Sequence, residues 1–248
     1  MGMIRVVRCT NAERLAYGGI EGGRLFYCTD TETMWMGTGS GDLIISNVAA
    51  EAVEFLDNFE DSARHWSWRD EAGNGSFTET SDYLQISVAG AAQADWWGGG
   101  ACDCPRAIIG CLRHPQEIIT KLTTCTVNGN TSAGVFITNN PLDGAADGYI
   151  LQRNNDQKIG VDELGVGNIA LTGAPVALPV WLRIRTIGHG NGNTTFFHYS
   201  TDGSAWTSLI SVDDLEFRAC GLFAKNFITW NAIDARFDFF NIIKDTGP

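Results

Sequence analysis

Aromatic rings and short polar side chains come together in three segments of this 248-residue chain. Tryptophan and tyrosine rings pack on the C–H face of a sugar, while planar amides and carboxylates bond its hydroxyl groups. The sequence therefore predicts a glycan-binding surface built from these loops. The candidate ligand-binding residues are Asp95, Trp96, Trp97, Asn139, Asp147, Tyr149, Asn154, Trp230 and Asn231. The alternative for any single tryptophan is burial in the core, since that residue is highly buried on average.

Carboxylates spaced to cleave a glycosidic bond do not stand out in the sequence. Retaining hydrolysis needs two carboxyl groups about 5 Å apart in one cleft. Glu54, Asp57 and Glu60 are spaced by three, which does not place them on one face of a strand. Asp162 and Glu163 are neighbours and so point to opposite faces of a strand. We therefore predict that the protein is not an enzyme.

Two groups of residues could hold a metal ion. Calcium takes six to eight oxygen ligands, and four carboxylates could supply some of them after folding: Asp57, Glu60, Asp61 and Asp238. The alternative is that these are solvated surface carboxylates. Three thiols and an imidazole could form a structural zinc site: Cys102, Cys104, Cys111 and His114. Their spacing is not that of paired CxxC motifs, so a disulfide or free thiols are the alternatives. The sequence predicts no required cofactor and leaves a structural calcium ion open.

The composition narrows the class of protein. The formal net charge is −12, which argues against nucleic-acid binding because that needs clustered Lys and Arg. No run of 18 apolar residues occurs, so we expect no membrane insertion. Residues 1–8 lack the apolar stretch of a secretory signal. We therefore expect a protein made in the cytoplasm.

Strand signals repeat from residue 57 to the end of the chain. In residues 181–206, Leu182 and Ile184 alternate with Arg183 and Arg185, and a Gly/Asn-rich turn follows. Such alternation with regularly spaced turns is typical of an antiparallel β-sandwich or jelly roll. We expect strands near residues 83–88, 106–112, 116–126, 132–138, 148–153, 157–163, 180–187, 194–200, 206–211, 219–225 and 233–243. The predicted fold class is all-β.

The first part of the chain is organised differently. Residues 1–46 contain a predicted β-hairpin, with residues 24–28 pairing with residues 33–36, and form a small N-terminal module. Residues 47–56 are predicted to connect it to the sandwich, residues 57–248. An apolar stripe in this connector, following a possible serine or asparagine cap, favours a short helix.

The main domain resembles the concanavalin A-like lectin/glucanase superfamily. Within it, the domain is similar to the sandwiches at the C-terminus of β-xylosidases and in their stand-alone relatives. The likeness is carried by Phe59, Trp66, Trp68 and segments 132–137, 148–151, 199–206, 220–224 and 235–240, in that order. This resemblance implies a lectin-like or glycoside-hydrolase-like sandwich.

The N-terminal module resembles the short β modules that begin phage tail fibres and other virion appendages. Its Gly22-Gly23, Thr29-Asp30-Thr31 turn and Gly37 carry the likeness. The resemblance implies anchoring or trimer formation through Phe26, Tyr27, Met34, Trp35 and Met36. We therefore predict a virion fibre, appendage or capsid-decoration protein with other virion proteins, itself and a surface glycan as partners. The alternatives are a hairpin packed on the sandwich and a cellular carbohydrate-binding or glycoside-hydrolase-like protein.

Overall fold

The structure of the chain is a computed structural model with two compact units, Met1–Ala52 and Val53–Pro248. Each unit is described here by itself. The described residues are 6–9, 25–28, 33–37, 42–47, 55–57, 59, 66–71, 73–80, 82–90, 104–110, 116–126, 129–139, 148–188, 192–213, 215, 217, 219–226 and 232–244.

A four-stranded sheet with the order β1-β2-β3-β4 forms the first unit. Its strands are β1 (Val6–Cys9), β2 (Leu25–Cys28), β3 (Thr33–Gly37) and β4 (Asp42–Asn47). The predicted hairpin is present, because β2 and β3 pair antiparallel with Phe26 opposite Trp35. β1 adds a parallel strand and β4 an antiparallel one, which extends a hairpin that would be marginal alone. The side chains of the predicted anchor residues lie outside the described part of the structure.

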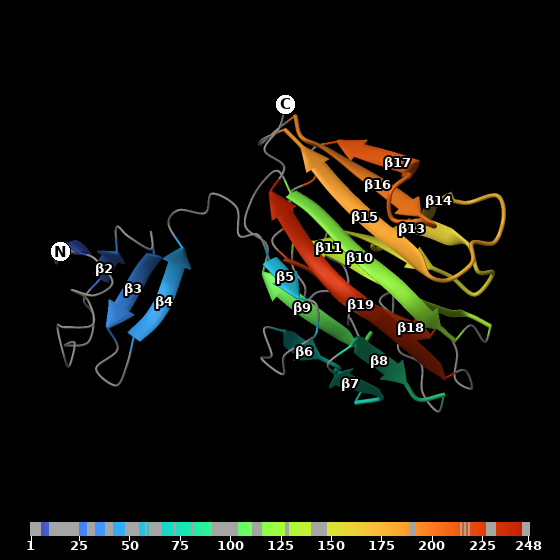
Figure 1. The fold of residues 1–248 in the computed structure, drawn as a ribbon, viewed down its shortest axis with the longest axis horizontal. Coiled ribbons are helices and arrows are strands. Elements are labelled where there is room, and N and C mark those ends of the chain that lie inside the picture. Colours follow the sequence, from blue (N-terminus) through green and yellow to red (C-terminus); the bar gives the residue numbers. More distant parts are fainter. Residues whose placement is uncertain are drawn as a thin grey trace. The chain divides into compact units, whose positions relative to one another are not determined.

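The second unit is a sandwich of two antiparallel sheets (Figure 1). The larger sheet has the order β17-β16-β15-β10-β19-β8-β7, and β5 also pairs with β19. Its strands are β5 (Phe55–Asp57), β7 (Gly75–Glu79), β8 (Leu84–Val88), β10 (Gln116–Cys125), β15 (Val180–Ile187), β16 (Thr194–Ser200), β17 (Thr207–Asp213) and β19 (Ile233–Lys244). We call it the eight-stranded sheet.

The seven-stranded sheet has the order β14-β13-β12-β11-β18-β9-β6. Its strands are β6 (Ser67–Arg69), β9 (Arg106–Gly110), β11 (Thr131–Thr138), β12 (Gly148–Arg153), β13 (Ile159–Glu163), β14 (Gly167–Leu171) and β18 (Ala219–Asn226). Every strand pair of both sheets is antiparallel. This confirms the predicted all-β antiparallel sandwich.

Alternating side chains place the core between the two sheets. On β15, Leu182 and Ile184 are buried while the residues between them are half-buried on the outer face. Phe197 of β16 is fully buried in the same core. The Trp66 ring meets Phe240 edge-on, with 5.0 Å between the ring centroids. In the seven-stranded sheet, β11, β12 and β18 are buried along their whole length, so both of their faces are covered.

The helix predicted in the connector does not extend over its two described ends, which are strands. Asn47 ends strand β4, and Phe55 and Leu56 belong to strand β5. Leu56 pairs with Asn241 of β19, and this backbone pairing stabilises a segment too short for a stable isolated helix. Residues 48–54 lie outside the described residues. In the part of the chain that the structure describes, no helix is long and apolar enough to cross a bilayer.

Candidate functional site

A row of polar side chains lies on the outer face of the seven-stranded sheet, the face turned away from the core. Leu151 and Val161 point into the core, so strand alternation turns their neighbours Gln152 of β12 and Asp162 of β13 outward. Asn168 of β14 lies beside Asp162. We call the set Ser132, Gln152, Asp162, Asn168 and Lys225 the polar row.

The Asp162 carboxylate is the centre of the polar row. Its Oδ1 accepts a hydrogen bond from Asn168 Nδ2 at 2.9 Å, and its Oδ2 accepts one from Gln152 Nε2 at 2.5 Å. The ammonium group of Lys225 lies 3.8 Å from the same Oδ2. These contacts hold a planar amide, a carboxylate and an ammonium group side by side on one face of the sheet. Such groups bond the hydroxyl groups of sugars in pairs.

Buried side-chain oxygens of the polar row include atoms with no hydrogen-bond partner among the described residues. These oxygens are Gln152 Oε1 and Ser132 Oγ. Gln152 is 3% exposed and Ser132 is fully buried, although the described strands cover only the inner face of this sheet. Buried polar atoms are almost always bonded, so an orphaned pair calls for an explanation such as a ligand or water.

Glycines flank Gln152 on both neighbouring strands. Gly134 of β11 and Gly160 of β13 are its register partners. Neither has a side chain, and the long Lys225 side chain of β18 reaches Asp162 of β13 across β11 and β12. The unbonded Gln152 oxygen therefore belongs to a residue whose neighbours on both adjacent strands lack side chains.

An apolar cluster lies on the same face of the sheet. Its members are Cys104, Ile108, Phe136, Ile150, Leu164, Ala219 and Phe223. Phe136 and Phe223 lie close to the paired residues Gly134 and Gln152, because Gly134 pairs with Phe223 on its other side. A small apolar surface with a few fixed polar groups is the usual composition of a binding site for a small molecule or sugar.

Of the predicted glycan-binding residues, the structure describes only Asn139, Tyr149 and Asn154, and Asn139 and Asn154 lie at opposite ends of one hairpin. Asn139 follows β11 and is half-buried, whereas Asn154 follows β12 at the opposite end of that hairpin. The Asn154 Oδ1 accepts hydrogen bonds from the backbone N–H of Asp156 and Lys158, so this side chain closes the turn between β12 and β13. The remaining loop residues lie outside the described residues: Asp95, Trp96, Trp97, Asp147, Trp230 and Asn231.

Tyr149 was predicted to face a ligand, and that prediction is wrong. Its ring is buried in the core and packs against Phe197, with 5.7 Å between the ring centroids. The reason is register: Tyr149 alternates with Ile150, so it shares the inner face with Leu151.

The predicted calcium ligands are not assembled in the described residues. Asp238 of β19 is engaged in an ion pair with Lys121, and this ammonium group competes with a cation there. Asp57 lies in β5, and Glu60 and Asp61 lie outside the described residues. Among the residues that the structure describes, no three His, Cys, Asp or Glu side chains are grouped to hold a metal ion.

Of the predicted zinc ligands, Cys104 alone falls within the described residues. It is a buried thiol, and its Sγ donates to the carbonyl oxygen of Ala224 at 3.4 Å. Cys102, Cys111 and His114 lie outside the described residues.

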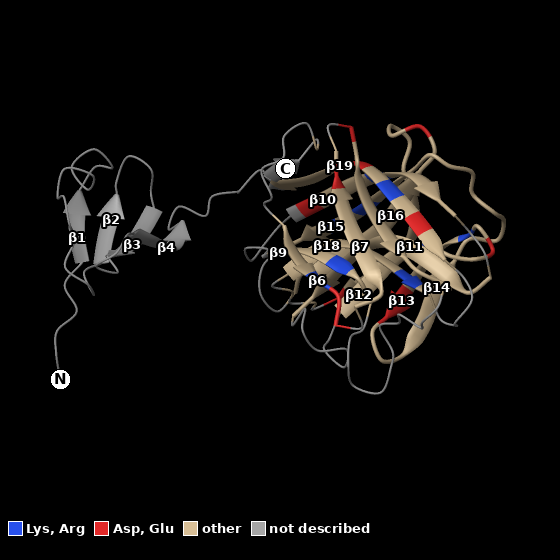
Figure 2. Cartoon of the chain, turned by 90° about the horizontal axis from the view of Figure 1, so that it is seen from below, with Lys and Arg blue, Asp and Glu red and all other residues tan. Residues whose placement is uncertain are grey.

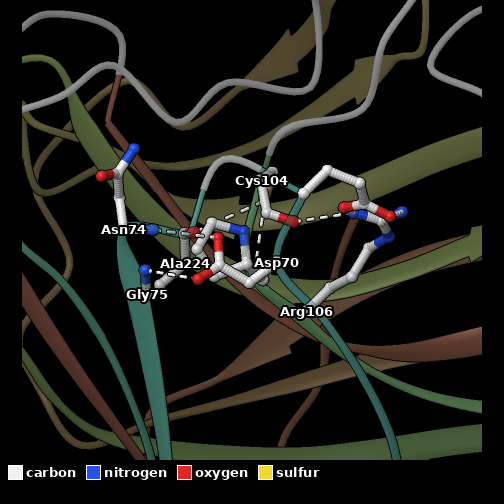
Figure 3. A network of polar contacts seen from close by, with 8 residues as sticks. Asp70, Asn74, Gly75, Cys104, Arg106 and Ala224 are labelled. Carbon is white, nitrogen blue, oxygen red and sulfur yellow. Dashed lines mark hydrogen bonds and ion pairs between the residues drawn. The ribbon is translucent and has the colours of Figure 1, made fainter.

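Cys104 also belongs to a network that joins the two sheets at one edge (Figure 3). The fully buried Arg106 of β9 donates two hydrogen bonds to Glu71, at 2.8 and 3.0 Å, and a third to the Cys104 carbonyl. The Asp70 carboxylate accepts from the backbone N–H of Gly75, the first residue of β7, at 2.7 Å. Residues 70–75 are therefore tied to β9 of the other sheet. These contacts are structural, since each charge has its partner in place.

A second surface with aromatic and charged side chains lies on the outer face of the eight-stranded sheet. The Arg183 guanidinium lies 4.2 Å from the Trp206 ring centroid, and Lys121 lies 5.1 Å from that of Trp181. Glu117 is 3.9 Å from Arg183. Figure 2 shows Lys and Arg interspersed with Asp and Glu on the sandwich. The charges on this surface, the tryptophan–arginine face, therefore neutralise one another.

His198 of the tryptophan–arginine face is expected to destabilise the fold in acid. Burial, followed by the charges of Arg183 and Arg185, lowers the pKa of His198 to about 4. Its folded-state pKa thus lies below the unfolded value of about 6.5. The stabilisation from the neutral imidazole is complete above pH 6.5 and is lost as the pH falls from there through 4. When the pH is lowered from 7 to 5, the free energy of unfolding measured in urea should fall more for the unaltered protein than for the variant His198→Gln.

The direct measurement is an NMR titration of the His198 ring. A midpoint near 4 is expected, and a midpoint near 6.5 would show that the ring is solvated and that this part of the geometry is wrong.

Comparisons with known proteins bear on the fold. The sequence matches no protein-family model and no curated protein. The GH43 BlXynB protein from Bacillus licheniformis is similar in structure, with a TM-score of 0.61 and 16% identity over 89% of this chain and 52% of that one. A bifunctional GH43-CE protein of Bacteroides eggerthii gives a TM-score of 0.58 and 13% identity over 91% of this chain and 35% of that one.

A third similar structure is an engineered GH43 glycoside hydrolase with both endo-xylanase and exo-arabinofuranosidase activity. It has a TM-score of 0.58 and 14% identity, over 90% of this chain and 54% of that one. The likeness supports the antiparallel β-sandwich fold. The chain spans about half of the length of two of these proteins and about a third of the other.

These likenesses correct the prediction that the protein is not an enzyme. The three structures are glycoside hydrolases or carry a GH43 part, so this fold occurs within enzymes of that class. The prediction relied on the absence of an obvious carboxylate pair in the sequence. That test was too narrow, because strand spacing alone does not show which carboxylates meet after folding. None of the three is described as a virion protein, so the virion resemblance of the first unit gains no support from them.

Proposed function

We propose that this chain binds a xylan-type polysaccharide through the polar row of the seven-stranded sheet, as a carbohydrate-binding protein of the glycoside-hydrolase type. The observation that carries the proposal is the buried, unbonded Gln152 oxygen beside Asp162, flanked by Gly134 and Gly160. The fold likeness to GH43 proteins, one with endo-xylanase and exo-arabinofuranosidase activity, supports the substrate class.

In the proposed complex, the polar row does most of the hydrogen bonding. Gln152 Oε1 accepts from a sugar hydroxyl, and the Lys225 ammonium and Asp162 carboxylate orient the neighbouring hydroxyl groups. Pentoses lack the hydroxymethyl group of a hexose, so a narrow site between flanking strands suits them.

Replacing Gln152 by alanine is expected to weaken binding to arabinoxylan and to xylohexaose about tenfold, since the change removes one or two buried hydrogen bonds. Isothermal titration calorimetry and affinity electrophoresis on the full chain measure this loss. A reducing-sugar assay on the same samples measures whether the full chain also cleaves the polysaccharide.

Trp206→Ala is the matched control because it removes a half-buried aromatic ring from the opposite sheet. It should leave binding unchanged, and circular dichroism should show both variants folded. If Trp206→Ala abolishes binding while Gln152→Ala does not, the glycan site lies on the tryptophan–arginine face. If the unaltered protein binds neither ligand, the proposed function is wrong.

The location in a virion, the trimer and the virion partners stay predictions. They rest on the resemblance of residues 22–39 to phage appendage modules. Size-exclusion chromatography with light scattering tests the trimer independently of glycan binding.

A further inference from the structure

Arg153 carries a positive charge into the space between the two sheets. It is the last residue of β12, alternates with the outward-facing Gln152, and shares the inner face with Leu151. Only 4% of it is exposed. Charged side chains are almost never buried to this extent unless a counter-charge accompanies them.

The partners of Arg153 among the described residues are all uncharged. Its Nε donates to the Val176 carbonyl at 3.2 Å, and its Nη2 donates to Gln157 Oε1 at 3.2 Å. The Cys125 thiol also contacts the guanidinium, and burial raises the pKa of that thiol to about 11, so it is neutral at pH 7. Nη1 is buried and has no hydrogen-bond partner among the described residues. Burial lowers the pKa of Arg153 itself, but an arginine stays charged at pH 7.

A second unbonded polar group lies at the same end of the sandwich. Thr131 begins β11, two residues before Ala133, the register partner of Arg153. It is buried, and its hydroxyl oxygen has no hydrogen-bond partner among the described residues. Cys125 ends β10 just before the connection to β11. Two hydrogen-bond donors without acceptors and a weak thiol donor thus gather at one end of the core.

The surroundings of these two groups favour a small ion. Val176, whose carbonyl holds Arg153, is itself buried, and its N–H donates to the Gln157 carbonyl at 2.8 Å. This hydrogen bond holds the segment that contains Val176 against the turn between β12 and β13. A guanidinium brings one unit of charge, so one monovalent anion neutralises it, whereas a divalent anion would leave an excess negative charge in the core.

We propose that the sandwich binds a small monovalent anion of the halide class between its sheets, held by Arg153 Nη1 and the Thr131 hydroxyl. The anion completes the hydrogen bonding of both groups and neutralises the guanidinium. It is a structural ligand of the fold and is independent of the polar row on the outer face.

Chloride is therefore expected to stabilise the protein specifically. At equal ionic strength, sodium chloride in place of sodium gluconate should raise the Tm of the full chain by about 5 °C once chloride reaches roughly 100 times its Kd. Gluconate is too large for a space between packed sheets. Crystals soaked in sodium bromide should show an anomalous peak beside Arg153.

Two variants decide whether the effect comes from these two groups. Arg153→Met removes the charge and should abolish the chloride-dependent rise in Tm, and Thr131→Val, which keeps the side-chain shape, should reduce it. If Arg153→Met does not fold, Thr131→Val and the bromide position give the answer. An unchanged Tm in chloride, an undiminished chloride effect in the variants, or bromide bound elsewhere only would each overturn the proposal.

Discussion

Phe197→Ala is expected to lower the free energy of unfolding by about 4 kcal/mol. The Phe197 ring is fully buried between the sheets and packs against Tyr149. Truncation removes the apolar contacts of the ring and leaves a cavity that the surrounding strands cannot close, because β15 and β17 hold β16 on both sides. Urea unfolding followed by tryptophan fluorescence measures the loss.

The adjacent Phe196 is the matched control. The same change there should cost only about 1 kcal/mol, as strand alternation places Phe196 half-buried on the outer face, stacked on His198. Both variants delete the same atoms, so the difference reports which face each ring occupies. Equal losses, or a larger loss at Phe196, would mean that the register of β16 is shifted by one residue and that the core is assigned to the wrong face.

Gly134→Ala should destabilise the protein by about 3 kcal/mol or more. A Cβ atom at this position would lie 2.0 Å from the carbonyl oxygen of Leu151 and 2.8 Å from Gln152 Cα. Both are backbone atoms of the neighbouring strand β12, so they cannot move aside as a flexible side chain would. The strands β11 and β12 would have to separate, and their hydrogen bonds would lengthen.

Gly173→Ala provides the comparison for this prediction. A Cβ atom there would meet nothing within 4 Å, and the expected change is within about 0.5 kcal/mol. Thermal and urea unfolding of both variants test the pair. If Gly134→Ala is as stable as Gly173→Ala, then β11 and β12 do not approach as closely as described, and the space beside Gln152 is also wrong.

The Gly134→Ala variant bears on the candidate site as well as on the fold. Gly134 is both a point of close approach in the sheet and the register partner of Gln152. A Cβ atom at Gly160, the other register partner of Gln152, would meet Leu171, Asn168 and Ala170 at 3.0 to 3.2 Å, so alanine there should separate the strands less than at Gly134. Such a variant separates loss of binding from loss of stability.

Strand alternation made much of the fold predictable. The eleven strands expected after residue 83 are all present, with β15 at 180–187 and β16 at 194–200 as predicted. The strands that escaped prediction are short or polar, such as β6 with its Ser-Trp-Arg sequence and β14. Their side chains alternate weakly, and they form because a neighbouring strand offers backbone hydrogen bonds.

The candidate site was harder to find from the sequence. In the sequence, Asp162 stands next to Glu163, and this pair does not suggest a binding site. Gln152 and Lys225 are each a single polar residue within an apolar strand, so no pattern connects them to Asp162. That isolation was the available signal, since a lone polar residue at an outward position of a buried strand needs a partner. The sequence could not show that the partners of Asp162 come from β12, β14 and β18.

By itself, the sequence determined the all-β class, the position of most strands and the inward-facing residues, because a period of two is a local property of the chain. The tertiary structure alone decided which strands are neighbours, that Tyr149 lies in the core, that Asp238 meets Lys121, and that Arg153 is buried without a carboxylate partner among the described residues. Those outcomes depend on contacts between residues far apart in the chain, whose energies no local pattern encodes.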